Sequence, residues 1–283
     1  MLNQAAGEWS VLTLDYEFGA VIEPKAGARR ATTPGRPLAR LYRFSNCTCF
    51  DRTGADAWVQ EQLGAIPEAA RSCGVGDLHA GCSADDYAQA VQRIRKWISA
   101  GDCYQVNYTF PLAFTWWGHP LALYAALRER QPVRHGGLLV TPEETVVSLS
   151  PELFLARRGE CLLTRPMKGT APRASDPATL RDSAKNRAEN LMIVDLLRND
   201  LGRVAETGSV QVDALFEIEE YPTVWQMVSQ VSARIGKRDT ASLLVALFPC
   251  GSITARYCCA AIGALPLRLG HRRAENPRHA DHR

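Results

Sequence analysis

The chain has 283 residues, 46% of them hydrophobic, so it is long enough to bury a core as one large domain or two smaller ones. Its formal net charge of +3 is too small to favour a nucleic acid or a membrane surface as a partner. No apolar run reaches the length of a membrane span, and the N-terminus lacks a basic start followed by an apolar core. We therefore expect a cytoplasmic protein.

Nine cysteines are scattered along the chain, and in a cytoplasmic protein they are expected to be free thiols. Cys47 and Cys49 form a C-x-C pair, and Cys258 and Cys259 are adjacent. Neither pair is accompanied by a second pair at the spacing of a zinc site, so we read all of them as ordinary thiols.

The N-terminal part is predicted to be rich in strands. The pattern over Trp9–Glu23 predicts a hairpin in which Gly19 separates two short strands, and strand character resumes over Leu38–Phe44. The glycines between Gly74 and Gly81 are not spaced as G-x-G-x-x-G. That stretch is therefore predicted to be a flexible connector rather than a phosphate-binding loop.

An amphipathic helix is predicted over Ser83–Ser99, with Ser83 as its N-cap and Gly101 as its end. The apolar residues repeat at helical spacing and are predicted to pack in the core: Tyr87, Ala90, Val91, Ile94, Trp97 and Ile98. A strand over residues 104–114 and a helix over Leu121–Glu129 are predicted to follow.

The middle of the chain reads as an antiparallel meander. Strands are predicted over residues 137–141, 145–150, 153–156 and 161–163, with turns between them. Helices flank this run of strands, which favours an α+β fold with antiparallel sheets and outer helices over a parallel βαβ array.

The last two of these strands place a carboxylate and an amine close together. Gly159 lies in the turn between them, so the strands pair as a hairpin and their far ends meet. Glu152 is then expected to lie near Lys168. A carboxyl group beside an amine suits a general acid working beside a nucleophile, but the same pair also fits a surface ion pair of little energetic value.

A long helix is predicted over Ala184–Asp200, with an apolar side formed by Ala188, Leu191, Met192 and Leu196. Glu189 lies at the edge of that side. Its carboxylate is expected either to pair with Lys185 or Arg187 in water, or to face a polar cleft. Strands over residues 210–218 and from 221 onward, a helix over 241–248 and a turn at 250–254 complete this part.

Five blocks of the sequence, taken together, resemble the chorismate-utilising enzymes, the family of anthranilate synthase, isochorismate synthase and aminodeoxychorismate synthase. The blocks are G-D-C-Y-Q-V-N (101–107), S-P-E-L-F (150–154), R-P-M-K-G-T (165–170), A-E-N-L-M-I-V-D-L-L-R-N-D-L-G-R (188–203) and G-S-I-T (251–254). They occur in the family's order. The resemblance covers most of the chain from about Ser10 to Thr254 and implies the family's anthranilate synthase-like α+β fold.

The resemblance also implies roles for single residues. It makes Lys168 and Glu152 catalytic and Glu189 a ligand of Mg²⁺, a metal that often takes only one or two carboxylates plus water and substrate. The residues expected to bind substrate are Gly169, Thr170, Ser252 and Thr254. Many relatives carry a histidine where this chain has Gln226, which cannot take up a proton at neutral pH, so an acid–base role at that position is in doubt.

Within the family, Lys168 matches the branch of aminodeoxychorismate synthase component I, since anthranilate-forming relatives carry a small apolar residue there. The implied reaction is the amination of chorismate at C4, on the route to 4-aminobenzoate and folate. No G-x-C-x-G nucleophile elbow is present, so a glutamine amidotransferase subunit is the expected partner and source of ammonia. The alternatives are an isochorismate, salicylate or anthranilate synthase-type enzyme, and an inactive remnant that only binds the glutaminase subunit.

The resemblance ends after Thr254, where the family continues with G-A-P-K and a long C-terminal portion. We expect residues 1–254 to form an incomplete chorismate-utilising domain and residues 255–283 to form an aberrant basic, disordered tail. A shift of reading frame is the preferred explanation, and a tail that evolved as such is the other. The missing portion would leave strand edges and apolar faces exposed, so we expect the chain as written to be poorly soluble and inactive.

Overall fold

The computed structural model describes residues 9–23, 37–103, 105–106, 108–250 and 267–269. The chain divides into two compact units, each built from discontinuous segments. The first unit contains residues 1–47, 96–108 and 152–263, and the second contains residues 48–95, 109–151 and 264–283. Both units combine helices with antiparallel sheets, which confirms the predicted α+β class.

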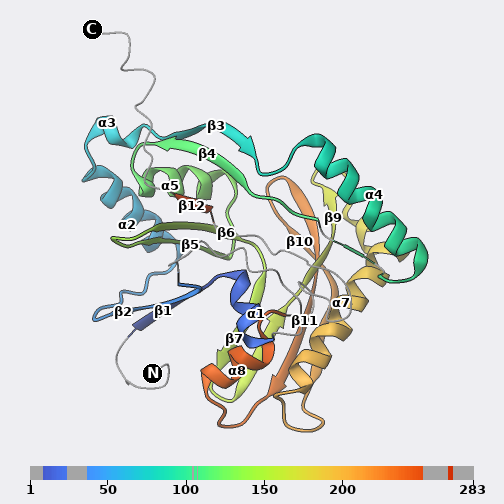
Figure 1. Cartoon of the computed structure of the whole chain (residues 1–283). Coiled ribbons are helices and arrows are strands. Elements are labelled where there is room, and N and C mark those ends of the chain that lie inside the picture. The colour runs from blue at the N-terminus through green and yellow to red at the C-terminus, as the bar shows by residue number, and fades with distance from the viewer. Residues whose placement is uncertain (1–8, 24–36, 104, 107, 251–266, 270–283) are drawn as a thin grey trace. The chain divides into compact units, whose positions relative to one another are not determined.

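The first unit is built around a five-stranded sheet with β11 at its centre (Figure 1). Antiparallel β10 pairs with one edge of β11, while β9 and β8 pair one after the other with its second edge, and β7 lies outside β8. The strands are β7 (Leu153–Arg158), β8 (Cys161–Arg165), β9 (Met167–Pro172), β10 (Gln211–Glu220) and β11 (Val224–Arg234).

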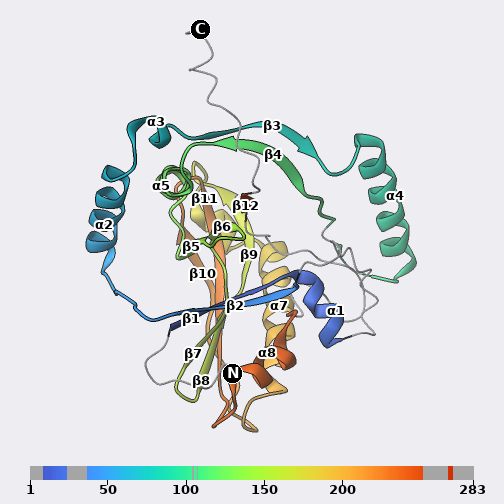
Figure 2. The ribbon, with the colours of Figure 1, turned by 60° about the vertical axis from the view of Figure 1, so that its left-hand side comes forward.

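One face of this sheet is covered by α7 (Ala184–Gly202), which contacts β9, β10 and β11 (Figure 2). The helix begins after Ser183, whose hydroxyl accepts a hydrogen bond from the Asn186 N–H and so satisfies one of the free amides of the first turn. The core contains buried side chains of α7, β8, β11 and α8 (Thr240–Leu247), among them Leu162, Val194, Leu201, Val231 and Leu243. The short helix α6 (Pro177–Arg181) packs near the start of α7.

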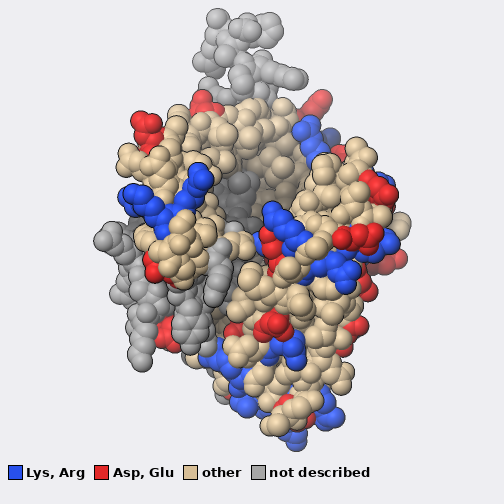
Figure 3. Space-filling model, turned by 90° about the vertical axis from the view of Figure 1, so that its right-hand side faces the viewer, with Lys and Arg blue, Asp and Glu red and all other residues tan. Residues whose placement is uncertain are grey.

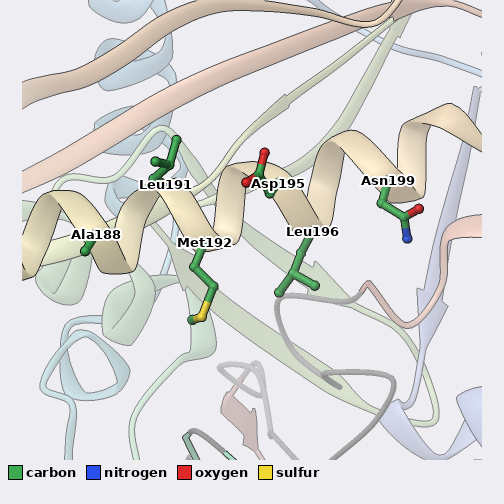
Figure 4. A pocket seen from close by; sticks show the side chains of 6 residues that line it. All are labelled: Ala188, Leu191, Met192, Asp195, Leu196 and Asn199. Atoms are coloured by element: carbon green, nitrogen blue, oxygen red, sulfur yellow. The ribbon is translucent and has the colours of Figure 1, made fainter.

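The predicted apolar side of α7 is not the side that packs on the sheet. Leu191 and Met192 are 44% and 39% exposed, whereas Ile193, Val194 and Leu197 are buried. Figure 4 shows Met192 and Leu196 projecting from the same side of the helix, where they line a shallow hollow. The prediction was wrong because the buried stripe includes two polar residues, Asn190 and Asp200, which a count of apolar spacing leaves out.

The N-terminal segment of the first unit also differs from its prediction. β1 (Trp9–Leu14) pairs with β2 (Ala39–Phe44) as an antiparallel ribbon, but the short strand predicted directly after Gly19 does not form. A 3-10 turn, η1 (Tyr16–Phe18), leads instead into the short helix α1 (Gly19–Ile22). A Cβ at Gly19 would lie 2.8 Å from the Pro249 ring, so this glycine permits close packing rather than marking a hairpin turn.

The second unit contains a two-stranded ribbon, a three-stranded sheet and helices. In the ribbon β3 pairs with β4, and in the sheet β6 lies between β5 and β12. Its described elements are α2 (Arg52–Gly64), α3 (Glu68–Arg71), β3 (Gly74–Ala80), β4 (Leu112–Trp117), α5 (Pro120–Arg130), β5 (His135–Val140), β6 (Thr145–Ser150) and β12 (Leu267–Leu269). Helix α4 (Ala84–Ala100) begins in this unit, and its last residues belong to the first.

Two predictions for this region need correction. The glycine-rich stretch from Gly74 is strand β3 and not a connector, because its backbone groups pair with those of β4. Ser83 caps α4 as predicted, since its hydroxyl accepts from the Asp86 N–H. The apolar stripe of that helix is not in the core, however: Tyr87 and Trp97 are nearly half exposed, and Ala90 is the one residue of α4 that is buried.

The distribution of charged side chains and the lengths of the helices can be stated for the described residues. The face shown in Figure 3 carries basic and acidic side chains interspersed with one another. Among the described residues, no helix is both long enough and apolar enough to cross a membrane. Cys49, Cys73 and Cys161 are free thiols, as expected.

Candidate active site

The predicted meeting of Glu152 and Lys168 occurs at a break in the sheet of the first unit. Gly159 has φ +61° in the turn between β7 and β8, and Leu153 pairs with Arg165, so the hairpin forms as predicted. Buried Pro166 then separates β8 from β9. Beyond it, the Met167 N–H donates to Oε1 of Glu152 at 3.2 Å, which holds the carboxylate beside the residue that precedes Lys168.

Lys168 and Gly169 form a β-bulge, in which two residues of β9 stand opposite one residue of β11. Thr170 pairs with Gln226 and Met167 with Val228, which leaves Met227 opposite both bulge residues. Gly169 has φ +105°, and a Cβ there would lie 3.2 Å from Asn186 Cβ. A bulge changes the direction of a side chain within a strand, so the lysine owes its orientation to the neighbouring glycine.

The charge state of Glu152 reflects two opposing influences. Burial of the carboxyl group raises its pKa above the ordinary value of 4.5, while the Met167 N–H and the charge of Lys168 act in the opposite direction. Burial has the larger effect. Part of the residue remains exposed to solvent, so the energetic consequence for folding is small. The hydrogen bond from the Met167 N–H places this carboxylate one residue away from Lys168 along β9.

This raised pKa gives a prediction for stability. A carboxyl group whose pKa is raised by folding holds its proton more tightly when folded, so its contribution to stability is lost as pH rises from 4.5 through the raised value. Glu152→Gln, which carries no charge, is therefore expected to be slightly more stable than the parent chain near pH 8 and equal to it near pH 4. Urea unfolding of both proteins at the two pH values measures this; a variant that is less stable at the higher pH contradicts it.

A buried polar network, which the sequence analysis missed, lies directly beneath the bulge. Asn190 of α7 is 1% exposed, and its Nδ2 donates to the carbonyl oxygens of Lys168 at 3.2 Å and Met227 at 3.3 Å. Its Oδ1 accepts from the hydroxyl of Ser229 at 2.6 Å, and that hydroxyl accepts from the Phe216 N–H at 3.2 Å. The sequence signal that could have indicated this network is Asn190 itself, a polar residue on the buried and mostly apolar side of α7.

The opposite face of the sheet carries a second group of polar side chains. Thr170 donates its hydroxyl proton to Oε1 of Gln226 at 3.0 Å, which fixes the orientation of the Gln226 amide and leaves its NH₂ group as a donor. Glu219 stands opposite Gln226 and accepts from Nη2 of Arg165 at 2.8 Å. Arg165 and Glu219 were not predicted as site residues: Arg165 lies in a recognised block, but its partner Glu219 is 54 residues away in sequence, and no local pattern indicates that they pair.

The predicted metal ligand, Glu189, lies on α7 next to Asn190. Its Oε1 is 4.0 Å from the Nζ of Lys185, one helical turn away, which is the ion pair that the sequence left open as an alternative. The described residues contain no group of three or more His, Cys, Asp or Glu side chains placed to hold a metal. One carboxylate fits Mg²⁺ when water and substrate supply the other oxygens, so Glu189 stays a prediction as a ligand.

Two of the predicted substrate-binding residues, Ser252 and Thr254, lie outside the described residues. The same is true of the tail from residue 255 onward, except for β12, which pairs antiparallel with β6. The structure thus brings together Glu152, Lys168, Gly169 and Thr170 around one bulge and places Glu189 on the helix that packs against it.

Comparison with known proteins shows which family the chain is related to. Residues 2–255 match the family model described as chorismate binding enzyme. The chain is 41% identical over 206 residues to aminodeoxychorismate synthase component 1 of Klebsiella aerogenes, an alignment that covers 70% of this chain and 45% of that protein. It is 39% identical over 183 residues to an anthranilate synthase component 1 of Haloarcula marismortui, covering 61% of this chain and 37% of that protein.

The fold has a solved counterpart. Anthranilate synthase component I from Streptococcus pneumoniae superposes with a TM-score of 0.68 at 22% identity, covering 89% of this chain and 64% of that one. The chain spans less than half the length of the two curated relatives named above. Nearly the whole described sequence, including every block around the bulge and α7, lies inside the family match, and the chain therefore belongs to the chorismate-binding enzymes.

Proposed function

We propose that this protein aminates chorismate at C4 to give 4-amino-4-deoxychorismate, with Lys168 as the nucleophile and Glu152 as the general acid, and that it is not the inactive remnant named above as an alternative. The observation that carries the proposal is geometric: Lys168 lies on a β-bulge, and the N–H of the residue before it donates to the Glu152 carboxylate. The raised pKa of that carboxyl group supports the proposal. The aminodeoxychorismate synthase relatives support this choice among the family's reactions.

The first step forms a covalent bond between the protein and the ring. Lys168, as the neutral amine, attacks C2 of chorismate; both ring double bonds shift and the C4–oxygen bond breaks. Glu152 gives its proton to the departing hydroxyl, which leaves as water. A carboxyl group with a raised pKa keeps that proton at higher pH than an ordinary glutamate does, which is what a general acid requires.

The second step releases the lysine. Ammonia adds at C4, both ring double bonds shift back, and the C2–nitrogen bond breaks so that its electron pair returns to Lys168. The carboxylate of Glu152 takes up the proton that the new amine loses, which restores the acid for the next turnover. The hydrogen bond from the Met167 N–H keeps the Glu152 carboxylate beside the reacting centre in both steps.

A metal ion and a partner belong to the proposal. Glu189, on the helix that packs against the bulge, would hold Mg²⁺ together with water and the substrate. When bound, Mg²⁺ neutralises a carboxylate of the dianionic substrate. A glutamine amidotransferase subunit would supply the ammonia, in keeping with the name component 1 that the Klebsiella relative carries.

The test is to trap the covalent intermediate. The chain is incubated with chorismate and Mg²⁺ without ammonia, denatured, digested, and mapped by mass spectrometry. An adduct of chorismate less one water is expected on Lys168 and absent from Lys185, which is 82% exposed and serves as an internal control. Added ammonium is expected to remove the adduct and release 4-amino-4-deoxychorismate. Formation of isochorismate without an adduct would assign the chain to the water-adding enzymes instead.

A further inference from the structure

We propose that Asn190 is a positioning residue for Lys168: its buried side-chain amide holds the bulge in the geometry that places the amine beside Glu152. This inference deepens the proposed function and rests on it. Asn190 lies on the face of the sheet covered by α7 and is 1% exposed, so it touches no substrate and acts only through the backbone of β9 and β11.

The first argument concerns the backbone groups that the bulge disturbs. Where two residues of one strand face a single residue of the next, the regular ladder of hydrogen bonds is interrupted. Here the interruption falls at Lys168 and Met227, and the carbonyl groups of both accept from Asn190 Nδ2. An unpaired buried carbonyl is costly, so the amide stabilises the bulge over a regular strand in this place.

The second argument is that the orientation of Asn190 is itself fixed. Its Oδ1 accepts from the hydroxyl of Ser229, which is fully buried. The same hydroxyl accepts from the N–H of Phe216, a residue with φ +59° in a second bulge on β10, opposite Ser229. Two bulges on either side of β11 are therefore joined through one serine and one asparagine, and the NH₂ group of Asn190 is directed at the carbonyl groups of Lys168 and Met227.

The third argument is that the lysine's backbone is held from both sides by groups of different kinds. The N–H of Met167 donates to the Glu152 carboxylate, and the carbonyl of Lys168 accepts from the Asn190 amide. The acid thus fixes the peptide group between Pro166 and Met167, and the amide fixes the one between Lys168 and Gly169. These two groups flank the Met167–Lys168 peptide, and the direction of the Lys168 side chain follows from them. A neutral amide does this without placing a second negative charge beside the amine.

The experiment compares the reactivity of single lysines in the full chain. The parent, Asn190→Leu and Ser229→Ala are labelled with a trace of acetic anhydride, and the acetylation of Lys168 relative to Lys185 is measured by mass spectrometry. Asn190→Leu adds no charge but loses the donors to both carbonyls. Leu201→Ala, at the far end of α7 and 1% exposed, is the matched control that loses core packing without touching the bulge.

Both network variants are expected to raise the Lys168 to Lys185 labelling ratio severalfold, because the lysine is no longer held beside Glu152. The Leu201→Ala control is expected to keep the parent ratio. In variants whose circular dichroism shows a folded chain, an unchanged ratio overturns the proposal; so does an equal change in Leu201→Ala, which would reflect a general loss of stability. If one of the two network variants does not fold, the Lys168 to Lys185 labelling ratio measured in the other variant decides.

A kinetic readout separates this proposal from the proposed function. Misplacement of a reacting group by about 1 Å can cost roughly 100-fold in rate, so ammonia-dependent kcat is expected to fall by about that factor while KM for chorismate stays nearly constant. If the parent chain forms neither adduct nor product, the proposed function fails. The labelling ratio still tests the positioning role of Asn190, because it requires no turnover.

Discussion

Replacing Gly169 with alanine is expected to lower the free energy of unfolding by about 2–5 kcal/mol, from backbone strain and overpacking together. The φ of +105° is one that residues with a side chain rarely adopt. The added Cβ would also lie 3.2 Å from Asn186 and 3.3 Å from Met227, so it would press against both α7 and β11. Urea unfolding at neutral pH, followed by circular dichroism, measures the loss.

Gly159→Ala is the matched control for this prediction. Gly159 has φ +61° in the turn between β7 and β8, but a Cβ there would meet nothing within 4 Å. The free energy of unfolding of Gly159→Ala should therefore fall only by the cost of the backbone conformation, about 1–2 kcal/mol. The difference between the two variants isolates the packing of Gly169 against its neighbours. Equal losses in both would contradict the view that the bulge is fixed by close packing.

The sequence predicted the central hairpin well because its signals are local. The apolar runs of β7 and β8, the glycine turn and the breaking effect of Pro166 are all read within a short stretch, and they place Glu152 near Lys168 before any tertiary contact is known. Helix α7 was likewise predicted within two residues of its end. Local propensity and tertiary packing agree in these elements, so the prediction and the structure agree as well.

The faces of the helices could not be predicted in the same way. On α7 the sequence offers two apolar stripes, and only the sheet decides that Ile193 and Leu197 are buried while Leu191 is exposed. The glycine-rich β3 was missed because its strand character comes from pairing with β4, which lies more than thirty residues away in sequence. Such long-range choices have no signature in the local pattern.

The same limit explains which site residues were missed. Asn190 lies inside a recognised block, yet its role depends on two bulges in strands far from it in sequence, at Lys168 and at Phe216. Bulges leave no periodic signal, since a single extra residue only shifts the alternation of side chains. The charged pair of Glu152 and Lys168 was predictable from a single hairpin. The role of the buried amide of Asn190 could be seen only once the register of β9, β10 and β11 was known.

Glu152→Gln is expected to reduce the ammonia-dependent kcat for chorismate by about 10²–10⁴-fold, the usual contribution of a general acid. The substitution keeps an oxygen that accepts from the Met167 N–H, so the fold and KM should change little. Glu160→Gln, in the exposed turn of the same hairpin, is the control and should retain the parent rate.

The dependence of kcat on pH decides whether Glu152 donates a proton or contributes only its negative charge. As a general acid it must be protonated, so kcat of the parent is expected to fall as pH rises through the raised pKa of this carboxyl group. That limb should be absent in Glu152→Gln, whose residual rate has no proton to lose at this position. If the limb persists unchanged in the variant, another group donates the proton and Glu152 serves only to hold Lys168 in place.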